Sequence, residues 1–304
     1  YEGADRARDL ARLSIARIAY TSASSARARG DERREAELLA HAIAVWAEVR
    51  TGSESFLDAF SEETWAFFLA GDDARALGHV HALLSPYFGD RAFPEALVIR
   101  ATIQFSHCLW DETEATIDDY HTRFDAALRE LEALEPTLGD EARALALVRR
   151  TRDEAETSPL LRSALADREL ARLAATSQSI AYESSRFGRA SGAFAPGTPL
   201  SLRMTTDLGL AHAFARTRLA DAVRSRVARL LGVLRDRAND IDAIQLEIHT
   251  ARRGALVTGD GRTSGTARER IEAVQGEVVW PFDGEYWEDE LPHYRVHLPD
   301  RCSR

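Results

Sequence analysis

The sequence contains no lysine, so all 39 of its basic residues are arginine. This absence excludes the phosphate-binding loop that ends in Gly-Lys-Ser or Gly-Lys-Thr. The sequence also lacks a His-Glu-x-x-His metalloprotease motif and a Gly-x-Ser-x-Gly nucleophile motif. A formal charge of −10 repels polyanions, which argues against nucleic acid and anionic lipid as partners. With no converging catalytic groups in the pattern, we expect a protein that is not an enzyme and carries no cofactor.

Proline and glycine are also scarce, at 9 and 18 of 304 residues, which favours a mostly helical chain. No run of about 20 apolar residues is present, so no membrane-spanning helix is predicted. The two cysteines, Cys108 and Cys302, lack Cys-x-x-Cys spacing, which argues against a redox or zinc motif. Their spacing alone leaves open whether they pair in a disulfide. The chain starts at Tyr1 within a helical pattern, and we expect it to be a fragment or a mature product.

The stretch from Ser61 to Tyr120 has the pattern of two helical hairpins in tandem. Gly71 ends one helical pattern and the acidic pair that follows begins the next, as a glycine cap followed by an N-terminal acidic turn should. The same arrangement returns at Cys108, which lies 37 residues after Gly71 (108 − 71). A similar hairpin is predicted before these two, with helices around 4–28 and 38–46. The pattern therefore predicts three hairpins over residues 1–124, enough for a stacked solenoid.

The spacing and the residues around these turns resemble tetratricopeptide (TPR) repeats, whose period is about 34 residues. With Gly71 at the turn, Phe67 takes the aromatic position of the first helix and Ala76 the small position of the second. In the next copy the corresponding packing positions are Ala101, Trp110 and Ile117. The chain departs from the repeat at two small positions, which are occupied by Thr64 and Thr113. The resemblance implies a right-handed superhelix that binds partners along its concave face.

Two longer stretches resemble TPR-containing envelope proteins of myxobacteria and related predatory or gliding bacteria. They are GDDARALGHVHALLSPYFGDRAFPEALVIRATIQFSHC, from Gly71 to Cys108, and VVWPFDGEYWEDEL, from Val278 to Leu291. Some relatives of that group are associated with the gliding-motility (Glt) machinery. The resemblance implies a periplasmic or envelope location.

Residues 125–253 are predicted to form long helices with a linker at 188–199. From Leu200 to about Arg253 one long helix carries apolar residues at heptad spacing. These residues are Val223, Val227, Leu230, Leu234, Ile241, Ile244 and Ile248. The seam must be covered, and the segment from Pro159 to Phe187 is the predicted antiparallel partner, giving a coiled-coil-like segment. Pairing between two copies of the chain is the competing use.

Residues 254–304 are predicted to form a flexible loop and an aromatic tail. Alternation in Tyr294, Val296 and Leu298 predicts one strand, and Val278 to Trp280 another. The fold class is thus all-α, with a TPR-like solenoid, a long antiparallel helical segment and a small strand-containing tail. Many aromatic residues occur in the tail, and they either pack back onto the helices or form a second interaction site. The candidates for that site are Trp280, Phe282, Tyr286 and Trp287.

The TPR resemblance implies a protein-binding concave face that is lined by the first helix of each hairpin. In the second hairpin its residues are Asp58, Ser61, Trp65 and Phe68, and in the third Glu95, Val98, Thr102 and Phe105. Aromatic side chains beside acidic ones suit a peptide partner, with Trp65 and Phe105 as anchors. The same rings could instead fill the inner seam of the solenoid.

Two functional interpretations follow from the sequence. The first is a non-enzymatic scaffold for protein partners in a bacterial envelope or gliding-motility complex. The second is a cytoplasmic helical regulator, or an enzyme accessory subunit, with an unrecognised ligand pocket. A metal ion near His293 and His297, which share a face if that segment is a strand, is the weakest hypothesis. No metal ligand set is therefore predicted.

Overall fold

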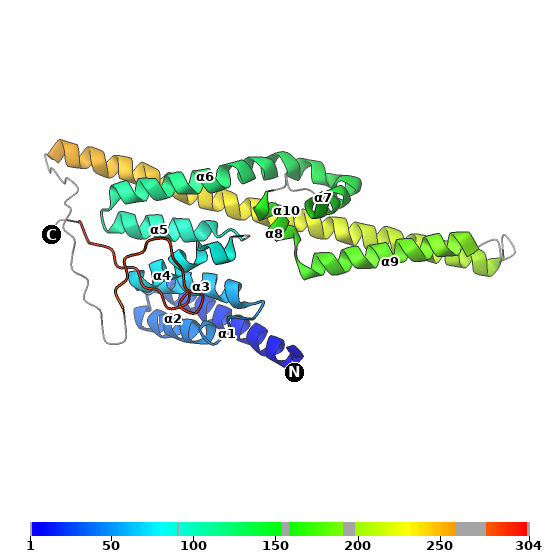
Figure 1. Cartoon of the computed structure of the whole chain (residues 1–304), viewed down its shortest axis with the longest axis horizontal. Helices are drawn as coiled ribbons and strands as arrows, with labels where there is room; N and C mark the ends of the chain where they lie inside the picture. Colours follow the sequence, from blue (N-terminus) through cyan, green and yellow to red (C-terminus); the bar gives the residue numbers. More distant parts are fainter. Residues whose placement is uncertain (1, 90, 154–157, 191–197, 259–277, 303–304) are drawn as a thin grey trace. The chain divides into compact units, whose positions relative to one another are not determined.

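The computed structural model describes residues 2–89, 91–153, 158–190, 198–258 and 278–302 of the chain (Figure 1). The chain divides into two compact units, which are described separately below. Unit 1 comprises Tyr1–His121 and Asn239–Arg304, and unit 2 comprises Thr122–Ala238. The prediction of an all-α chain is confirmed, because the described residues form helices and no strand. None of the described helices is both long and apolar enough to cross a membrane.

Unit 1 is built from consecutive helices joined by short turns. They are α1 (Glu2–Ala28), α2 (Glu32–Trp46), α3 (Phe56–Leu69), α4 (Asp73–Leu83), the short η1 (Pro86–Phe88), α5 (Pro94–Ser106) and the start of α6 (Trp110–Leu134). Each of α1 to α4 packs against the next α-helix in the chain, and α3 also packs against α5. Two more segments complete the unit, the end of α10 (Pro199–Thr258) and the tail, residues 278–302.

The three predicted hairpin turns share one backbone geometry. Gly30, Gly71 and Cys108 each adopt a positive φ, of 72°, 75° and 55°. In each turn the next residue donates its N–H to a carbonyl five residues earlier, as in Asp72 to Phe67 at 2.9 Å. This is the Schellman arrangement, which satisfies the carbonyls left free at a helix end. Cys108 differs from the other two turn residues because it is not glycine. A side chain at a positive φ costs about 1–2 kcal/mol.

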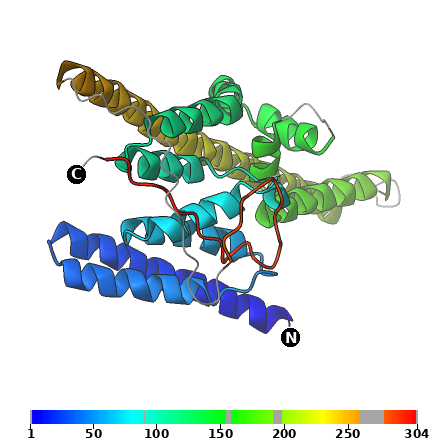
Figure 2. The ribbon, with the colours of Figure 1, turned by 60° about the vertical axis from the view of Figure 1, so that its left-hand side comes forward.

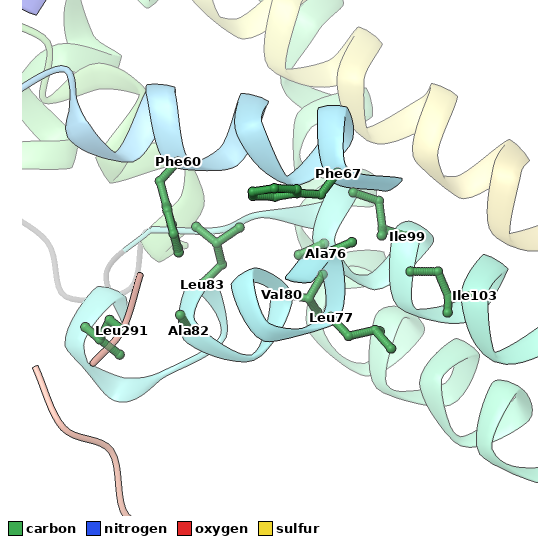
Figure 3. Close-up of a cluster of buried hydrophobic side chains, with 11 residues drawn as sticks. Phe60, Phe67, Ala76, Leu77, Val80, Ala82, Leu83, Ile99, Ile103 and Leu291 are labelled. Atoms are coloured by element: carbon green, nitrogen blue, oxygen red, sulfur yellow. The ribbon is translucent and has the colours of Figure 1, made fainter. Parts of the chain in front are cut away.

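The core of unit 1 lies between the stacked helices. Small residues of α1 and α2 allow close packing in the first cluster, which contains Leu39, Ala42 and Trp46. The second cluster joins α3, α4 and α5, and Figure 3 shows its side chains converging around α4. Leu291 of the tail belongs to this second cluster and is buried. The tail is therefore part of the core of unit 1.

Two predicted strands are wrong, because the described tail is neither helix nor strand. The tail runs alongside α4 (Figure 2), where the Val296 N–H donates to the Ala74 carbonyl at 3.0 Å. A helix has few free backbone groups, so it cannot offer the ladder that a strand requires. The alternation of Tyr294, Val296 and Leu298 instead places these side chains, all partly buried, against the second core cluster.

Gly78 allows the tail backbone to pass directly over α4. A Cβ atom at Gly78 would lie within 3 Å of three backbone atoms of Tyr294 and Arg295. Backbone cannot move aside as a flexible side chain can. Only glycine at position 78 is therefore compatible with the observed path of the tail.

Gly78→Ala is expected to lower the free energy of unfolding of unit 1 by about 1–3 kcal/mol, because overpacking forces the backbone to shift. The matched control is Gly209→Ala in α10, where a Cβ would meet nothing within 4 Å. That substitution should instead raise helix stability by roughly 0.5–1 kcal/mol. Calorimetry of both variants measures whether each substitution raises or lowers the free energy of unfolding. An equal stabilisation by both would show that the tail does not cross α4 at this point.

Unit 2 contains the rest of α6 and the elements that follow it. These are η2 (Glu135–Gly139), α7 (Glu141–Asp153), α8 (Pro159–Leu165), α9 (Arg168–Ala190) and α10 as far as Ala238. Ser158 caps α8, with Pro159 in its first turn. Residues 191–197, the centre of the predicted linker, and residues 259–277 lie outside the described residues. The predicted start of the flexible loop at 254 is wrong, because 254–258 belong to α10.

The predicted long helix is confirmed as α10, of 60 residues. Its heptad residues are buried except Leu230, whose neighbour Leu231 enters the core instead. The predicted cover was only partly right, because 159–187 forms two helices, α8 and α9, and α9 buries only Leu170 and Ala174. In unit 2, α6 also flanks α10, with Arg235 to Glu132 at 3.2 Å. Within unit 1, Arg252 of α10 lies 2.7 Å from Asp111 of α6.

Candidate interaction surfaces

The predicted concave-face residues of α3 remain partly accessible. Asp58 is exposed, and Ser61, Trp65 and Phe68 are half-buried. The rings of Trp65 and Phe68 meet edge to face at 6.0 Å between centroids. Both rings also pack against the second core cluster. Core packing therefore fixes these two rings in place, while part of each ring remains accessible.

The predicted residues of α5 divide differently. Glu95, Thr102 and Phe105 are half-buried, but Val98 is only 4% exposed and is not available to a partner. The prediction for Val98 is therefore wrong. α5 is covered over a wide arc because it contacts both α3 and α4, and Arg100 reaches α6 at Asp119, 3.0 Å away.

The aromatic tail divides into buried and exposed residues. Tyr286 and Tyr294 pack against the second core cluster, whereas Trp280, Phe282 and Trp287 are exposed. The predicted second site therefore keeps three of its four residues at the surface. Tyr286 instead packs back onto the helices, which is the other role that the sequence left open for the tail aromatics.

His81 of α4 is the residue on which the tail aromatics converge. Its ring stacks on Tyr286 at 4.7 Å and meets the rings of Phe282 and Tyr294 edge to face at 4.5 and 5.3 Å. Burial, together with the charge of Arg100, lowers the pKa of His81. A neutral imidazole suits this apolar, aromatic environment.

A disulfide between Cys108 and Cys302 fastens the end of the tail to the turn between α5 and α6. The Cα atoms lie 5.1 Å apart, although the residues are 194 positions apart in sequence. Next to it, the Arg301 N–H donates to the His107 carbonyl at 3.0 Å. The pairing left open by the sequence is thus formed.

Two buried titratable groups lie in the same part of unit 1. Burial raises the pKa of Glu63 in α3 to about 8, opposed by the charge of Arg75. Burial lowers the pKa of His79 in α4 to about 4. The His79 ring stacks on Phe60 at 4.1 Å between centroids. Both groups are therefore held in their neutral forms near pH 7, which is what an apolar core favours.

At least two pockets open on the described part of unit 1. The larger, of about 510 Å³, lies among α1 to α4, and is lined by Leu39, Ile43, Arg27 and Arg75 among others. Its two guanidinium groups are already paired, Arg27 with Glu35 and Arg75 with Asp72. The second, of about 450 Å³, lies between the α3–α4 turn and the tail, where His107 pairs with Asp73 at 3.1 Å.

The described residues contain no group of three or more histidine, cysteine or acidic side chains that could hold a metal ion. His293 and His297, the candidates from the sequence, are both exposed and do not lie on a strand. The premise that placed them on one face is therefore wrong.

The sequence interpretation missed the roles of Gly78 and His81. The signal was present in α4, DARALGHVHAL, which is apolar around most of its circumference. A helix of that kind must be covered on more than one side. The tail covers the side of α4 that α3 and α5 leave open.

Comparisons of the chain with protein-family models, with curated proteins and with solved structures gave no match.

Proposed function

We propose that the chain is a non-enzymatic scaffold that binds protein partners on the first-helix faces of TPR-like hairpins. The observation that carries this proposal is the shared geometry of the turns at Gly30, Gly71 and Cys108. Repeated hairpins of this kind stack to give an extended face that can hold a peptide. Trp65, Phe68 and Phe105 contribute accessible aromatic surface to that face.

We further propose that the scaffold works in the bacterial envelope, within a gliding-motility or similar complex. The disulfide supports an oxidising location such as the periplasm, because disulfides seldom persist in the cytosol. The segment from Gly71 to Cys108 resembles envelope TPR proteins, and this resemblance supports the same location.

The test is retention of partners from a detergent-solubilised envelope extract. Trp65→Ala/Phe105→Ala is expected to lose the specifically retained proteins, because each anchor contributes roughly 2 kcal/mol, or about thirtyfold in affinity. Asp58→Arg, at an exposed position, reverses charge on the same face without opening a cavity. The matched control is Tyr87→Ala, which removes an exposed aromatic ring elsewhere in unit 1.

Circular dichroism should first establish that every variant is folded. Retention of the same proteins by wild type, Tyr87→Ala and both face variants would exclude the first-helix faces as the binding surface. Failure of wild type to retain any envelope protein would count against the scaffold itself.

The second candidate is a cytoplasmic helical regulator or accessory subunit with a ligand pocket. The pocket of about 510 Å³ among α1 to α4 favours it, since its size lies in the range of small-molecule sites. Free thiols at Cys108 and Cys302 in the native protein would support this candidate over the envelope scaffold.

A further inference from the structure

The tail presents an exposed aromatic surface, here called the tail face and defined by Trp280, Phe282 and Trp287. Their exposed fractions are 50%, 53% and 40%. The rings of Trp280 and Trp287 meet edge to face, 4.7 Å between centroids. Large aromatic side chains at this level of exposure, gathered in one short segment, mark an interaction site more often than single exposed residues do.

The tail face is held in place by contacts beneath it. The Phe282 ring meets the His81 ring edge to face. The backbone N–H of Trp287 donates to the Tyr294 hydroxyl at 2.9 Å. Gly284, with a φ of 95°, turns the chain between the two. Leu291 then anchors the segment in the core. A surface ordered in advance loses little conformational entropy on binding, which favours affinity.

The segment that carries the tail face has charged residues of one sign only. Residues 278–290 contain five carboxylates and no arginine. Of these, Asp283, Glu288, Asp289 and Glu290 are exposed, and none of the five takes part in a salt bridge among the described residues. An apolar surface bordered by unpaired negative charge attracts a cationic partner. The same charge disfavours a symmetric contact between the tail faces of two copies.

We propose that the tail face binds an arginine- or lysine-bearing peptide segment of a protein partner. Cationic groups can lie over the indole rings of Trp280 and Trp287, where cation–π attraction is strongest for tryptophan. The carboxylates of Glu288 and Asp289 supply charge-assisted hydrogen bonds to the same groups. An apolar side chain of the peptide then covers Phe282. This site is separate from the first-helix faces of the proposed function and does not depend on them.

The test uses a fluorescein-labelled peptide of alternating arginine and leucine, titrated with the full chain by anisotropy. Wild type is expected to bind, with an affinity that falls as salt is raised. Trp287→Ala should weaken binding about tenfold or more, as expected for an aromatic anchor. Glu288→Gln/Asp289→Asn should weaken binding and reduce its salt dependence. Asp242→Asn/Glu247→Gln, at exposed positions of α10 in unit 1, is the matched control and should bind as wild type does.

Three results would overturn the proposal. One is equal binding of the peptide with glutamate in place of arginine, and another is no binding of the arginine peptide by wild type. The third is self-association of the chain that Trp287→Ala abolishes, which would assign the tail face to a second copy. Trp65→Ala/Phe105→Ala should leave peptide binding intact. A failure of the proposed function is therefore distinguishable from a failure of the tail face.

Discussion

Cys302→Ser is expected to lower the free energy of unfolding of unit 1 by about 2–5 kcal/mol. The disulfide closes a loop between residues 194 positions apart, and the entropy that it removes from the unfolded chain grows with loop length. The end of the tail also loses its tether. The amides of Val296 and Arg301, which donate to Ala74 and His107, should then exchange with solvent much faster.

Denaturant unfolding, read in the transition assigned to unit 1, and hydrogen exchange measure these two effects. Cys108→Ser/Cys302→Ser should match the single variant, because both remove the same bond. Cys108→Gly/Cys302→Ser should recover about 1 kcal/mol over that double variant, since glycine suits the φ of 55° at position 108. Unchanged stability and unchanged exchange in Cys302→Ser would contradict the tethering role.

Glu63→Gln is expected to stabilise unit 1 at pH 8 and above by several kcal/mol. Burial raises the pKa of Glu63 from 4.5 to about 8 in the folded chain. The folded state therefore holds a proton that the unfolded state has released, and stability falls as pH rises from about 4.5 to 8. At about 1.36 kcal/mol for each pH unit, the upper bound is about 5 kcal/mol. Glutamine is always neutral and avoids this loss.

The measurement is the free energy of unfolding from pH 4.5 to pH 9 for wild type and Glu63→Gln. The difference should vanish near pH 4.5 and reach its maximum above pH 8, the value to which the pKa of Glu63 is raised. His79, whose pKa is lowered to about 4, destabilises both proteins equally as pH falls below 6.5, so the difference isolates Glu63. Asp58→Asn, an exposed carboxylate on α3, is the control. A constant difference across the range would show that Glu63 is ionised in the folded chain.

The hairpins were predictable because their signals are local. Gly71 and Asp72 determine a positive φ and an N-cap within two residues, and the Asp72 carboxylate accepts from the Arg75 N–H as a cap should. The long α10 was predictable for the same reason, since its apolar period is carried by the helix itself. Interactions between residues within one helical turn can be predicted from a single sequence.

The tail was not predictable in the same way, because its structure depends on α4, far away in the sequence. The alternating residues from Tyr294 to Leu298 satisfy a strand pattern equally well, and only the close passage of the tail backbone over Gly78 decides against it. Val98 was misplaced for a related reason. Its position follows the TPR pattern, but the burial of α5 depends on how many helices surround it.

Unit 1 is discontinuous, and this has a consequence for how the protein is made. During synthesis α4 leaves the ribosome with its tail-facing side uncovered, and Leu291 follows only after all of unit 2 has been translated. The side that carries His81 is thus exposed to the cell throughout that interval. Unit 1 therefore reaches its final form only after unit 2 has been translated, although α1 to α5 emerge before any part of unit 2.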